Sequence, residues 1–546
     1  MRQPYFLALA LGGVGTLALG SVAWAQLPGL RVVYPPENHQ TPSDRIFFIG
    51  TGDPNQPVLI NGVAIENRSD SGHFAPTVPL ELGDNQFTLT QGDESVTFTI
   101  TRIAQGPSLP DELGFAADSL APTRDIARPP GELICLAAVA PAGATVTAAV
   151  ADISLALLPQ NNAVELPPNY AVLTAQTDPV NVRGPVRYES CFLPNQPGPL
   201  GTPTYTLTMG GEQVTAAATG AISILDPEQF EVAAVTASAG VARTGPSTSY
   251  SRITPLPAGT RARVTGREGD WLRLDYGGWI RAGETEVLTS GAPPRSIIRG
   301  VSSSQVPGWT EVYFPLQVPV PVEIDQTADT LTLTLHNTTP QTDTIFIGDD
   351  PVIQRLDWQP VLPDKARYRF RFKTDQQWGY KLRYEGTTLV LSLKHPPSSA
   401  DARPLAGTTI LVDPGHGGDE LGARGPDGTP EKAVNLDVSL LLRDALEARG
   451  ATVIMTRTDD SASGPNARAD QINRDEPDLA LSIHYNALPD SGDALNTAGI
   501  GAFWYQAQAH DLAQFLHDYL VAELDRPAYG VYWNNLALTR PHVAPS

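Results

Sequence analysis

The chain has 546 residues, a formal net charge of −22 and a sequence pI of about 4.8. One hydrophobic core does not extend over so long a chain, so several domains are expected. The acidic balance excludes nucleic acid as a partner, because binding to a polyanion requires a basic face. Abundant Pro (50) and Gly (48), with only 18% charged residues, predict many short strands joined by turns.

The N-terminus has the pattern of an export signal. Met1-Arg2 provides a short basic start, residues 6–22 form an apolar run, and Ala23-Trp24-Ala25 is an A-x-A cleavage pattern. We therefore predict a signal peptide over residues 1–25 and a protein exported to the periplasm or cell wall. The alternative is an uncleaved anchor, since the run approaches the lower length limit of a spanning helix. No other stretch could cross a bilayer, so no stable span is expected after cleavage.

Short alternating runs predict two β modules in the first half. Residues 30–105 contain Asn61-Gly62, a strong hairpin turn signal, and resemble an immunoglobulin-like sandwich. Residues 106–131 are Pro-rich without periodicity and are interpreted as a linker. Residues 132–228 form a second β-rich unit with the only two cysteines, Cys135 and Cys191. The sequence leaves a disulfide and two buried thiols equally open.

Two further β modules are predicted before residue 396. Residues 230–290, with Gly240-Val-Ala-Arg-Thr-Gly-Pro-Ser and the segment from Trp271 to Trp279-Ile280, resemble a bacterial SH3-like domain. That resemblance implies binding to cell-wall peptides; the alternative is that both tryptophans serve only the core, which we favour for Trp279. Residues 295–395 alternate in Thr330–Leu335 and have a distant similarity to the amidase N-terminal (AMIN) domain.

After Leu405 the pattern changes to alternating strands and helices, which predicts an α/β domain over residues 405–546 with a mostly parallel sheet covered by helices. Pro430 and Gly450 bracket the first helix. The expected strands are 408–412, 452–456, 478–483 and 501–505, and the expected helices are 431–449 and about 509–524.

Three side chains are expected at the carboxyl edge of this sheet. His416 follows the first strand in Asp413-Pro-Gly-His-Gly-Gly, Glu431 opens the next helix, and His484 ends a later strand in Ser-Ile-His-Tyr-Asn. Open α/β sheets bind their ligands at this edge. Two imidazoles and a carboxylate form a catalytic zinc set with a fourth position for water. Asp413 and Asn486 are predicted to orient the ligating imidazoles.

These three segments, in this order, resemble the metal-binding signature of the zinc-dependent N-acetylmuramoyl-L-alanine amidases (amidase type 3 family). Arg457, Arg468 and Gly499–Trp504 extend the similarity. The resemblance implies a twisted sheet between helices, Zn²⁺ held by His416, Glu431 and His484, and peptidoglycan as the partner. It implies hydrolysis of the amide between N-acetylmuramic acid and L-alanine, as in cell-wall remodelling and septum splitting. Arg457 and Arg468 are expected to anchor loops by ion pairs, and His510, His517 and His542 to lie on solvated faces.

One departure from the family concerns the general base. In the family a Glu on a later strand takes this role, and Asn535–Arg540 matches the approach to that strand. We expect this Glu beyond Ser546 and interpret the α/β domain as C-terminally incomplete, so no catalytic base is assigned. The alternatives to an amidase are a non-catalytic wall-binding or regulatory protein and a zinc peptidase acting on stem peptides. The short connection at residues 506–508 predicts an open cleft, the alternative being that another module folds over it.

Overall fold

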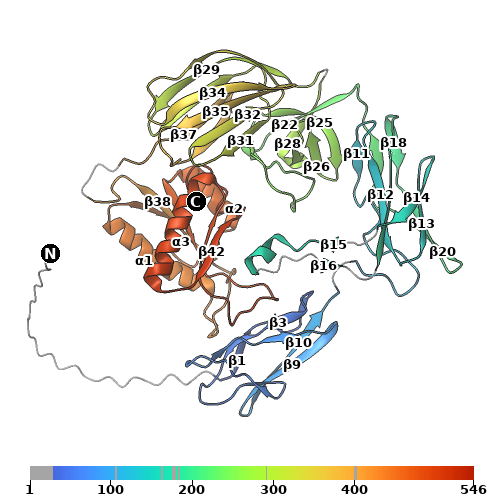
Figure 1. Ribbon diagram of the computed structural model, residues 1–546, viewed down its shortest axis with the longest axis vertical. Coiled ribbons are helices and arrows are strands. Elements are labelled where there is room, and N and C mark those ends of the chain that lie inside the picture. The colour runs from blue at the N-terminus through green and yellow to red at the C-terminus, as the bar shows by residue number, and fades with distance from the viewer. Residues whose placement is uncertain are drawn as a thin grey trace, which may run out of the picture.

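The computed structural model describes residues 29–104, 107–160, 164–174, 180–181, 185–290, 292–398 and 403–546. The predicted signal peptide over residues 1–25 lies outside the described residues. Figure 1 shows a mostly β, multidomain chain in which the α-helices of the described part all belong to the C-terminal domain. None of the described helices combines the length and apolar composition that a bilayer span requires.

The N-terminal module packs three aromatic rings between its sheets. Phe48 contacts Phe87 and Phe98 edge to face, with ring centroids 5.4 and 5.7 Å apart. The predicted turn at Asn61-Gly62 joins the two strands of a hairpin, and both residues have positive φ as such a turn requires. One of the two larger sheets has the order β1 (Arg31–Tyr34), β4 (Ile49–Thr51), β7 (His73–Phe74). The other has the order β2 (His39–Thr41), β10 (Glu94–Arg102), β9 (Gly83–Gln91), β5 (Leu59–Ile60), β6 (Val63–Ala64). In addition, β3 (Arg45–Phe47) pairs with β8 (Thr77–Pro79).

The second module contains a six-stranded antiparallel sheet whose core includes the buried Tyr188 and Tyr205. Its strands, in spatial order, are β12 (Ile134–Ala140), β17 (Val186–Phe192), β14 (Ile153–Pro159), β13 (Thr145–Val150), β19 (Thr204–Met209) and β20 (Glu212–Ala217). An excursion from this module carries β15 (Val164–Glu165), η1 (Asn169–Thr174) and β16 (Val180–Asn181).

The predicted linker over residues 106–131 is structured in its described part. Its apolar side chains Leu113, Phe115 and Leu120 pack against the core of the second module. Its end forms β11 (Ile126–Arg128), which pairs with β21 (Ile222–Ile224) of that module and with β25 (Arg261–Glu268) of the next. Proline content predicted a linker, but burial of these apolar residues overrides it. The second module and the SH3-like module therefore share a continuous sheet.

The SH3-like module has a core that includes the buried Leu256, Leu272 and Ile280. Trp279 is only 7% exposed, in agreement with the core role favoured for it, and Trp271 is also buried. Besides β25, the SH3-like module contains β22 (Phe230–Val235), β23 (Ala239–Gly240), β24 (Leu256–Pro257), β26 (Trp271–Leu274), β27 (Trp279–Arg281) and β28 (Thr285–Ser290). The short helix η2 (Ala282–Glu284) precedes β28. From the second module, β18 (Gly198–Gly201) joins the shared sheet.

The fourth module is a sandwich of two sheets around a core that contains Phe314, Tyr368 and Phe370. One sheet has the order β33 (Thr338–Phe346), β29 (Ser296–Val306), β30 (Trp309–Pro315), β37 (Thr388–Lys394), β36 (Tyr380–Glu385). The other has the order β31 (Val322–Gln326), β32 (Thr330–Leu335), β35 (Lys365–Phe372), β34 (Ile353–Val361).

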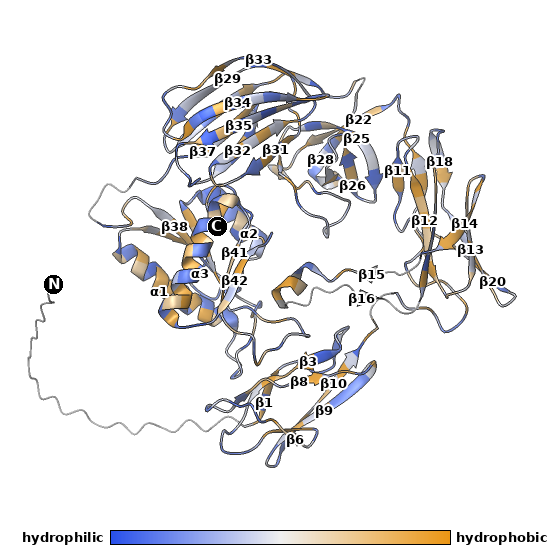
Figure 2. Cartoon of the chain, viewed as in Figure 1, coloured by the Kyte–Doolittle hydropathy of each residue, from blue (hydrophilic) through white to orange (hydrophobic). Residues whose placement is uncertain are grey.

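The C-terminal domain has two groups of parallel strands rather than the single sheet that was expected. Strands β39 (Thr452–Met455), β38 (Thr409–Pro414) and β40 (Leu479–Ile483) form one sheet, while β41 (Ile500–Trp504) pairs with β42 (Ala528–Trp533). The helices are α1 (Glu431–Ala448), α2 (Pro465–Asp475) and α3 (His510–Leu524), with η3 (Ala507–Ala509) before the last. Figure 2 shows that α1 has both hydrophobic and hydrophilic residues; Leu442 and Leu446 pack on the sheet, whereas Leu441 is exposed.

The fourth module packs tightly on the C-terminal domain. Lys394, only 8% exposed, donates from Nζ to the carbonyls of Glu476 and Pro477 at 2.7 and 2.5 Å. The imidazole of His542 stacks on Tyr380 with centroids 4.7 Å apart, and its burial lowers its pKa to about 4. The expectation of solvated histidines fits His510 but is wrong for His517, which is buried, and for His542.

Acidification should weaken this contact through His542. The unfolded chain binds a proton near the usual pKa of 6.5, the folded chain only near 4, so stability falls as pH decreases through this window. The upper limit of the loss is about 3 kcal/mol. His542→Phe preserves the stacking and removes the titration. Urea unfolding between pH 7 and 4.5 should show a steeper loss for the wild type than for this variant, and parallel losses would contradict the prediction.

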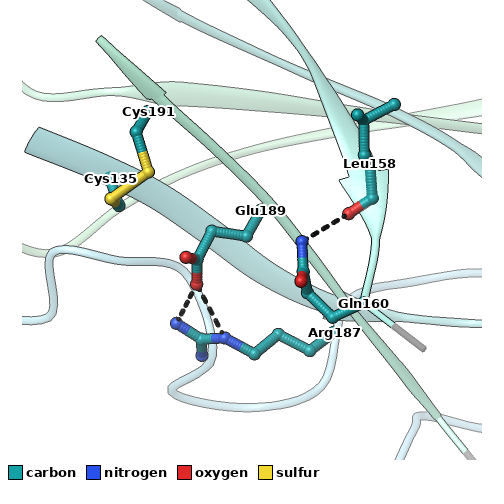
Figure 3. The surroundings of a disulfide bond; sticks show 6 residues. All are labelled: Cys135, Leu158, Gln160, Arg187, Glu189 and Cys191. Carbon is teal, nitrogen blue, oxygen red and sulfur yellow. Dashed lines mark hydrogen bonds and ion pairs between the residues drawn. A yellow bond between two sulfur atoms is a disulfide. The ribbon is translucent and has the colours of Figure 1, made fainter. Parts of the chain in front are cut away.

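Cys135 and Cys191 form a disulfide, which resolves the alternative that the sequence left open. They are direct partners in the antiparallel register of β12 and β17 (Figure 3). On β17, which carries Cys191, Arg187 and Glu189 form an ion pair at 2.8 Å. The bond closes a segment with a sequence separation of 56 residues. Restricting so long a segment lowers the entropy of the unfolded module.

Removing the disulfide should destabilise the second module. We expect the double variant Cys135→Ser/Cys191→Ser to lose about 2–4 kcal/mol of unfolding free energy. Calorimetry should show the transition of the second module, which shares a sheet with the SH3-like module, shifted to lower temperature, while the transitions of the N-terminal and fourth modules stay in place because these have their own cores. Superimposable traces for variant and wild type would contradict this.

Candidate metal centre

The pairing of two parallel strands brings the predicted histidines together. His416 lies two residues beyond the end of β38, and His484 follows β40 directly. Pro414 pairs with Ile483 in the parallel register, so both imidazoles emerge at the carboxyl ends of adjacent strands. Their ring centroids are 4.8 Å apart. With Glu431, the first residue of α1, they offer three ligand atoms that all lie within 4.8 Å of one another.

Glu431 holds the centre together through both oxygens. Oε1 lies 3.0 Å from Nδ1 of His484 and accepts a hydrogen bond from the backbone N–H of Tyr485 at 2.9 Å. Oε2 accepts from the N–H of Ala423 at 2.8 Å and lies 3.3 Å from Nε2 of His416. Burial alone would raise the pKa of Glu431, but these hydrogen bonds outweigh it and lower the pKa to about 2. The carboxylate is therefore ionised, as a metal ligand must be.

The backbone around His416 is adapted to a close approach. His416 has a left-handed φ of +62°. A residue other than Gly adopts this backbone conformation at a cost of about 1–3 kcal/mol. At Gly415 a side chain would collide with the ring of His484, and at Gly422 a Cβ would lie 2.6 Å from Oε2 of Glu431. The glycine-rich segment thus leaves room for the candidate ligand side chains.

Two arginines fix the loop that carries His416. Arg457 donates from Nε to the carbonyl of Pro414 and from Nη2 to that of Gly415, both at 2.9 Å. Arg468 donates to the carbonyl of His416 at 2.6 Å. These arginines were expected to anchor loops by ion pairs, and most of the anchoring instead uses backbone carbonyls. A planar guanidinium with five N–H donors suits several carbonyls at once.

The residues next to the ligands differ in part from the prediction. The buried Asp413 accepts from the hydroxyls of Thr456 and Ser482 and lies 3.5 Å from Nη1 of Arg468, so its carboxylate braces the sheet edge rather than an imidazole. Beside the candidate ligands themselves, Glu420 also contacts His416, with its Oε1 3.2 Å from Nδ1. Asn486 is exposed and its role stays a prediction.

Sequence reasoning missed Asn435. Its side chain is fully buried and donates to the carbonyl of Gly415 at 3.1 Å and to Oε1 of Glu431 at 3.4 Å. It lies four residues after Glu431 on α1, on the same helix face. That spacing was the available signal, because a polar residue on the buried face of a helix requires a partner.

The centre is accessible to solvent on one side. The side chains of His416 and His484 are 20% and 33% exposed, whereas that of Glu431 is 4% exposed. Two nitrogens and one carboxylate oxygen, with an open side, match the donor set of a catalytic site for a divalent metal. Elsewhere in the described residues, Cys135, Glu189 and Cys191 also cluster, but the disulfide occupies both sulfurs.

Comparison with known proteins identifies two regions of the chain. Residues 410–546 match the family model for N-acetylmuramoyl-L-alanine amidase, and residues 239–286 match the model for the bacterial SH3 domain. The chain thus contains an amidase domain and an SH3 domain.

Individual amidases are among the similar proteins. The germination-specific N-acetylmuramoyl-L-alanine amidase of Bacillus subtilis is 36% identical over 138 residues, which is 22% of this chain and 56% of that protein. The probable cell wall amidase LytH of Staphylococcus aureus is 38% identical over 134 residues, 24% of this chain and 40% of that protein. An N-acetylmuramoyl-L-alanine amidase structure from Clostridium difficile 630 has 29% identity and a TM-score of 0.24, covering 25% of this chain and 75% of that one. The chain spans about half the length, or less, of these curated relatives.

The three-residue group should bind about one divalent metal ion per chain. His416→Ala and His484→Ala should each lose bound metal after dialysis, because two protein ligands hold an ion far more weakly than three. Asn435→Ala should retain the ion with an affinity about 10–100-fold lower, since it removes a partner of a ligand. Elemental analysis and metal titration measure both effects. His510→Ala is the matched control, and equal metal content in all four variants would contradict the assignment.

Proposed function

We propose that the chain is an exported, zinc-dependent N-acetylmuramoyl-L-alanine amidase that hydrolyses the amide between N-acetylmuramic acid and L-alanine in peptidoglycan. The observation that carries this proposal is the convergence of His416, Glu431 and His484 within the region that matches the amidase model. Zinc suits the donor set, because the ion accepts imidazole nitrogen and carboxylate oxygen with one position open.

The protein atoms that would hold the ion follow from the hydrogen bonds. Glu420 contacts Nδ1 of His416; if Nδ1 carries the proton, the lone pair of Nε2 faces Glu431. Nδ1 of His484 faces the same carboxylate from the other side. When bound, Zn²⁺ supplies a Lewis acid that polarises the carbonyl and lowers the pKa of water toward roughly 7. Arg457 and Arg468 keep the His416 loop in place, so the donor atoms are preorganised.

The β modules supply the second part of the proposal. An insoluble polymer is hydrolysed faster by an enzyme that stays attached to it, because attachment raises the local substrate concentration. The SH3 domain at residues 239–286 and the fourth module are candidates for this attachment. The fourth module packs on the amidase domain through Lys394 and His542, so a surface that binds the wall there would hold the metal centre at a fixed distance.

Product chemistry tests the proposed function. The protein is incubated with purified sacculi, and the soluble products are analysed by mass spectrometry. An amidase releases intact stem peptides with a free L-alanine amino group. Shortened stems would instead mean a peptidase, and sedimentation with sacculi without any product would mean a wall-binding protein.

Loss of a ligand should abolish the hydrolysis. We expect His416→Ala and Glu431→Gln to lower the rate by about 10³-fold or more, since the metal contributes several kcal/mol of transition-state stabilisation. His510→Ala, an exposed imidazole outside the group, should have the wild-type rate. Comparable rates for the ligand variants and this control would refute the metal-dependent mechanism.

A further inference from the structure

Two loops border the metal centre, and both contact the N-terminal module. We call residues 417–430 and 485–499 the rim loops, because the first precedes Glu431 and the second follows His484. Arg31 of the module donates from Nη1 to the carbonyl of Asp427 at 2.7 Å. In the second rim loop, Asp490 accepts from the hydroxyl of Tyr34 and lies 2.9 Å from Nε2 of His39. Residues about 400 to 450 positions apart therefore meet beside the centre.

The contact between the N-terminal module and the second rim loop is well packed and hydrogen-bonded. His39 and Asp490 have side chains only 22% and 25% exposed. Tyr34 also stacks on Phe47, with ring centroids 4.9 Å apart. Burial, together with the hydrogen bond to Asp490, raises the pKa of Tyr34. Burial alone would raise the pKa of Asp490, but hydrogen bonds from the module lower it.

The first rim loop is shaped for the module as well. The guanidinium of Arg31 occupies the space beside Gly428 that any side chain at this position would need. Gly428 also has a φ of +86°, which other residues rarely adopt. Polar and charged groups meet across the contact: Arg31 donates to the carbonyl of Asp427, His39 lies beside Asp490, and Arg45 interacts electrostatically with Asp493.

Each contact lies a short stretch of chain away from a metal ligand. Asp427 precedes Glu431 by four residues, and Asp490 follows His484 by six. The second rim loop also touches the centre directly, because the N–H of Tyr485 donates to Oε1 of Glu431. The module nevertheless leaves His416 and His484 partly exposed. It borders the centre and does not plug it.

We propose that the N-terminal module forms a fixed wall of the substrate cleft and that Asp490 is the positioning residue that fixes it. Docking of Tyr34 and His39 on Asp490 orders the second rim loop, and the loop and module together define the side from which a polymeric substrate approaches the metal. The activity consequence rests on the proposed amidase function. The docking itself does not.

Backbone hydrogen exchange of residues 485–499 tests the docking in the full-length protein. Asp490→Ala and Tyr34→Phe each remove a hydrogen bond involving the carboxylate, and we expect exchange in the second rim loop about tenfold faster or more. Asp93→Ala, an exposed carboxylate in the turn between β9 and β10, is the matched control. Exchange rates equal to those of the control would overturn the docking.

Kinetics on sacculi test whether the N-terminal module forms a wall of the substrate cleft. Asp490→Ala should raise the apparent KM about threefold or more, leave kcat within about twofold and retain wild-type zinc content, because the residue acts on the loop and not on the metal. Asp490→Asn, which keeps an acceptor for Tyr34, should recover part of the loss. An unchanged KM, or loss of zinc, would overturn the positioning role. If the wild type hydrolyses no peptidoglycan, the proposed function fails, and hydrogen exchange alone decides whether the module is docked.

Discussion

The candidate metal centre depends on the parallel pairing of β38 with β40. This pairing places the segment after Pro414 beside the segment after Ile483, and the two imidazoles that follow therefore face the same carboxylate. Glu431 then connects three elements, because its oxygens bond to His484, to the loop at Ala423 and, at 3.3 Å, approach His416. A shift of one residue in the register would direct the side chains of one strand to the opposite face. The chemistry proposed for the chain is thus a consequence of strand register.

The arginines around this candidate metal centre illustrate how positively charged groups can hold a loop without pointing at the candidate ligands. Arg457 and Arg468 are buried, and their guanidiniums point at the carbonyls of residues 414–416. Burial lowers the pKa of Arg457 and the neighbouring Arg468 adds to this effect, yet the group remains charged at neutral pH. Their role is mechanical: they tie down a loop in which His416 has a left-handed conformation.

The convergence of His416, Glu431 and His484 was predictable from sequence because each residue belongs to a local pattern. Strand endings and a helix start are encoded by neighbouring residues, and parallel strands end at one edge of a sheet. The residues around the ligands followed this logic less well: Asp413 was assigned to an imidazole, although its partners are Thr456, Ser482 and Arg468. Long-range contacts gave no local signal at all. Tyr34 and Asp490 are 456 positions apart, and nothing near either residue encodes the other. Composition wrongly predicted a linker over residues 106–131. This proline-rich segment has few apolar residues, but those it has pack on the core of the second module.

The strand β11 determines how the β modules move. It pairs with β21 of the second module and β25 of the SH3 domain, and Arg128 adds an ion pair with Glu268 at 2.6 Å. A flexible linker would let the two modules search independent volumes, with a reach that grows as the square root of its length. A shared sheet has no such freedom. If the second module and the SH3 domain both bind the cell wall, the shared sheet sets the separation of their binding surfaces. The polymer must then present its binding groups at a matching spacing. The pair then acts as a ruler for the polymer rather than as two independent tethers.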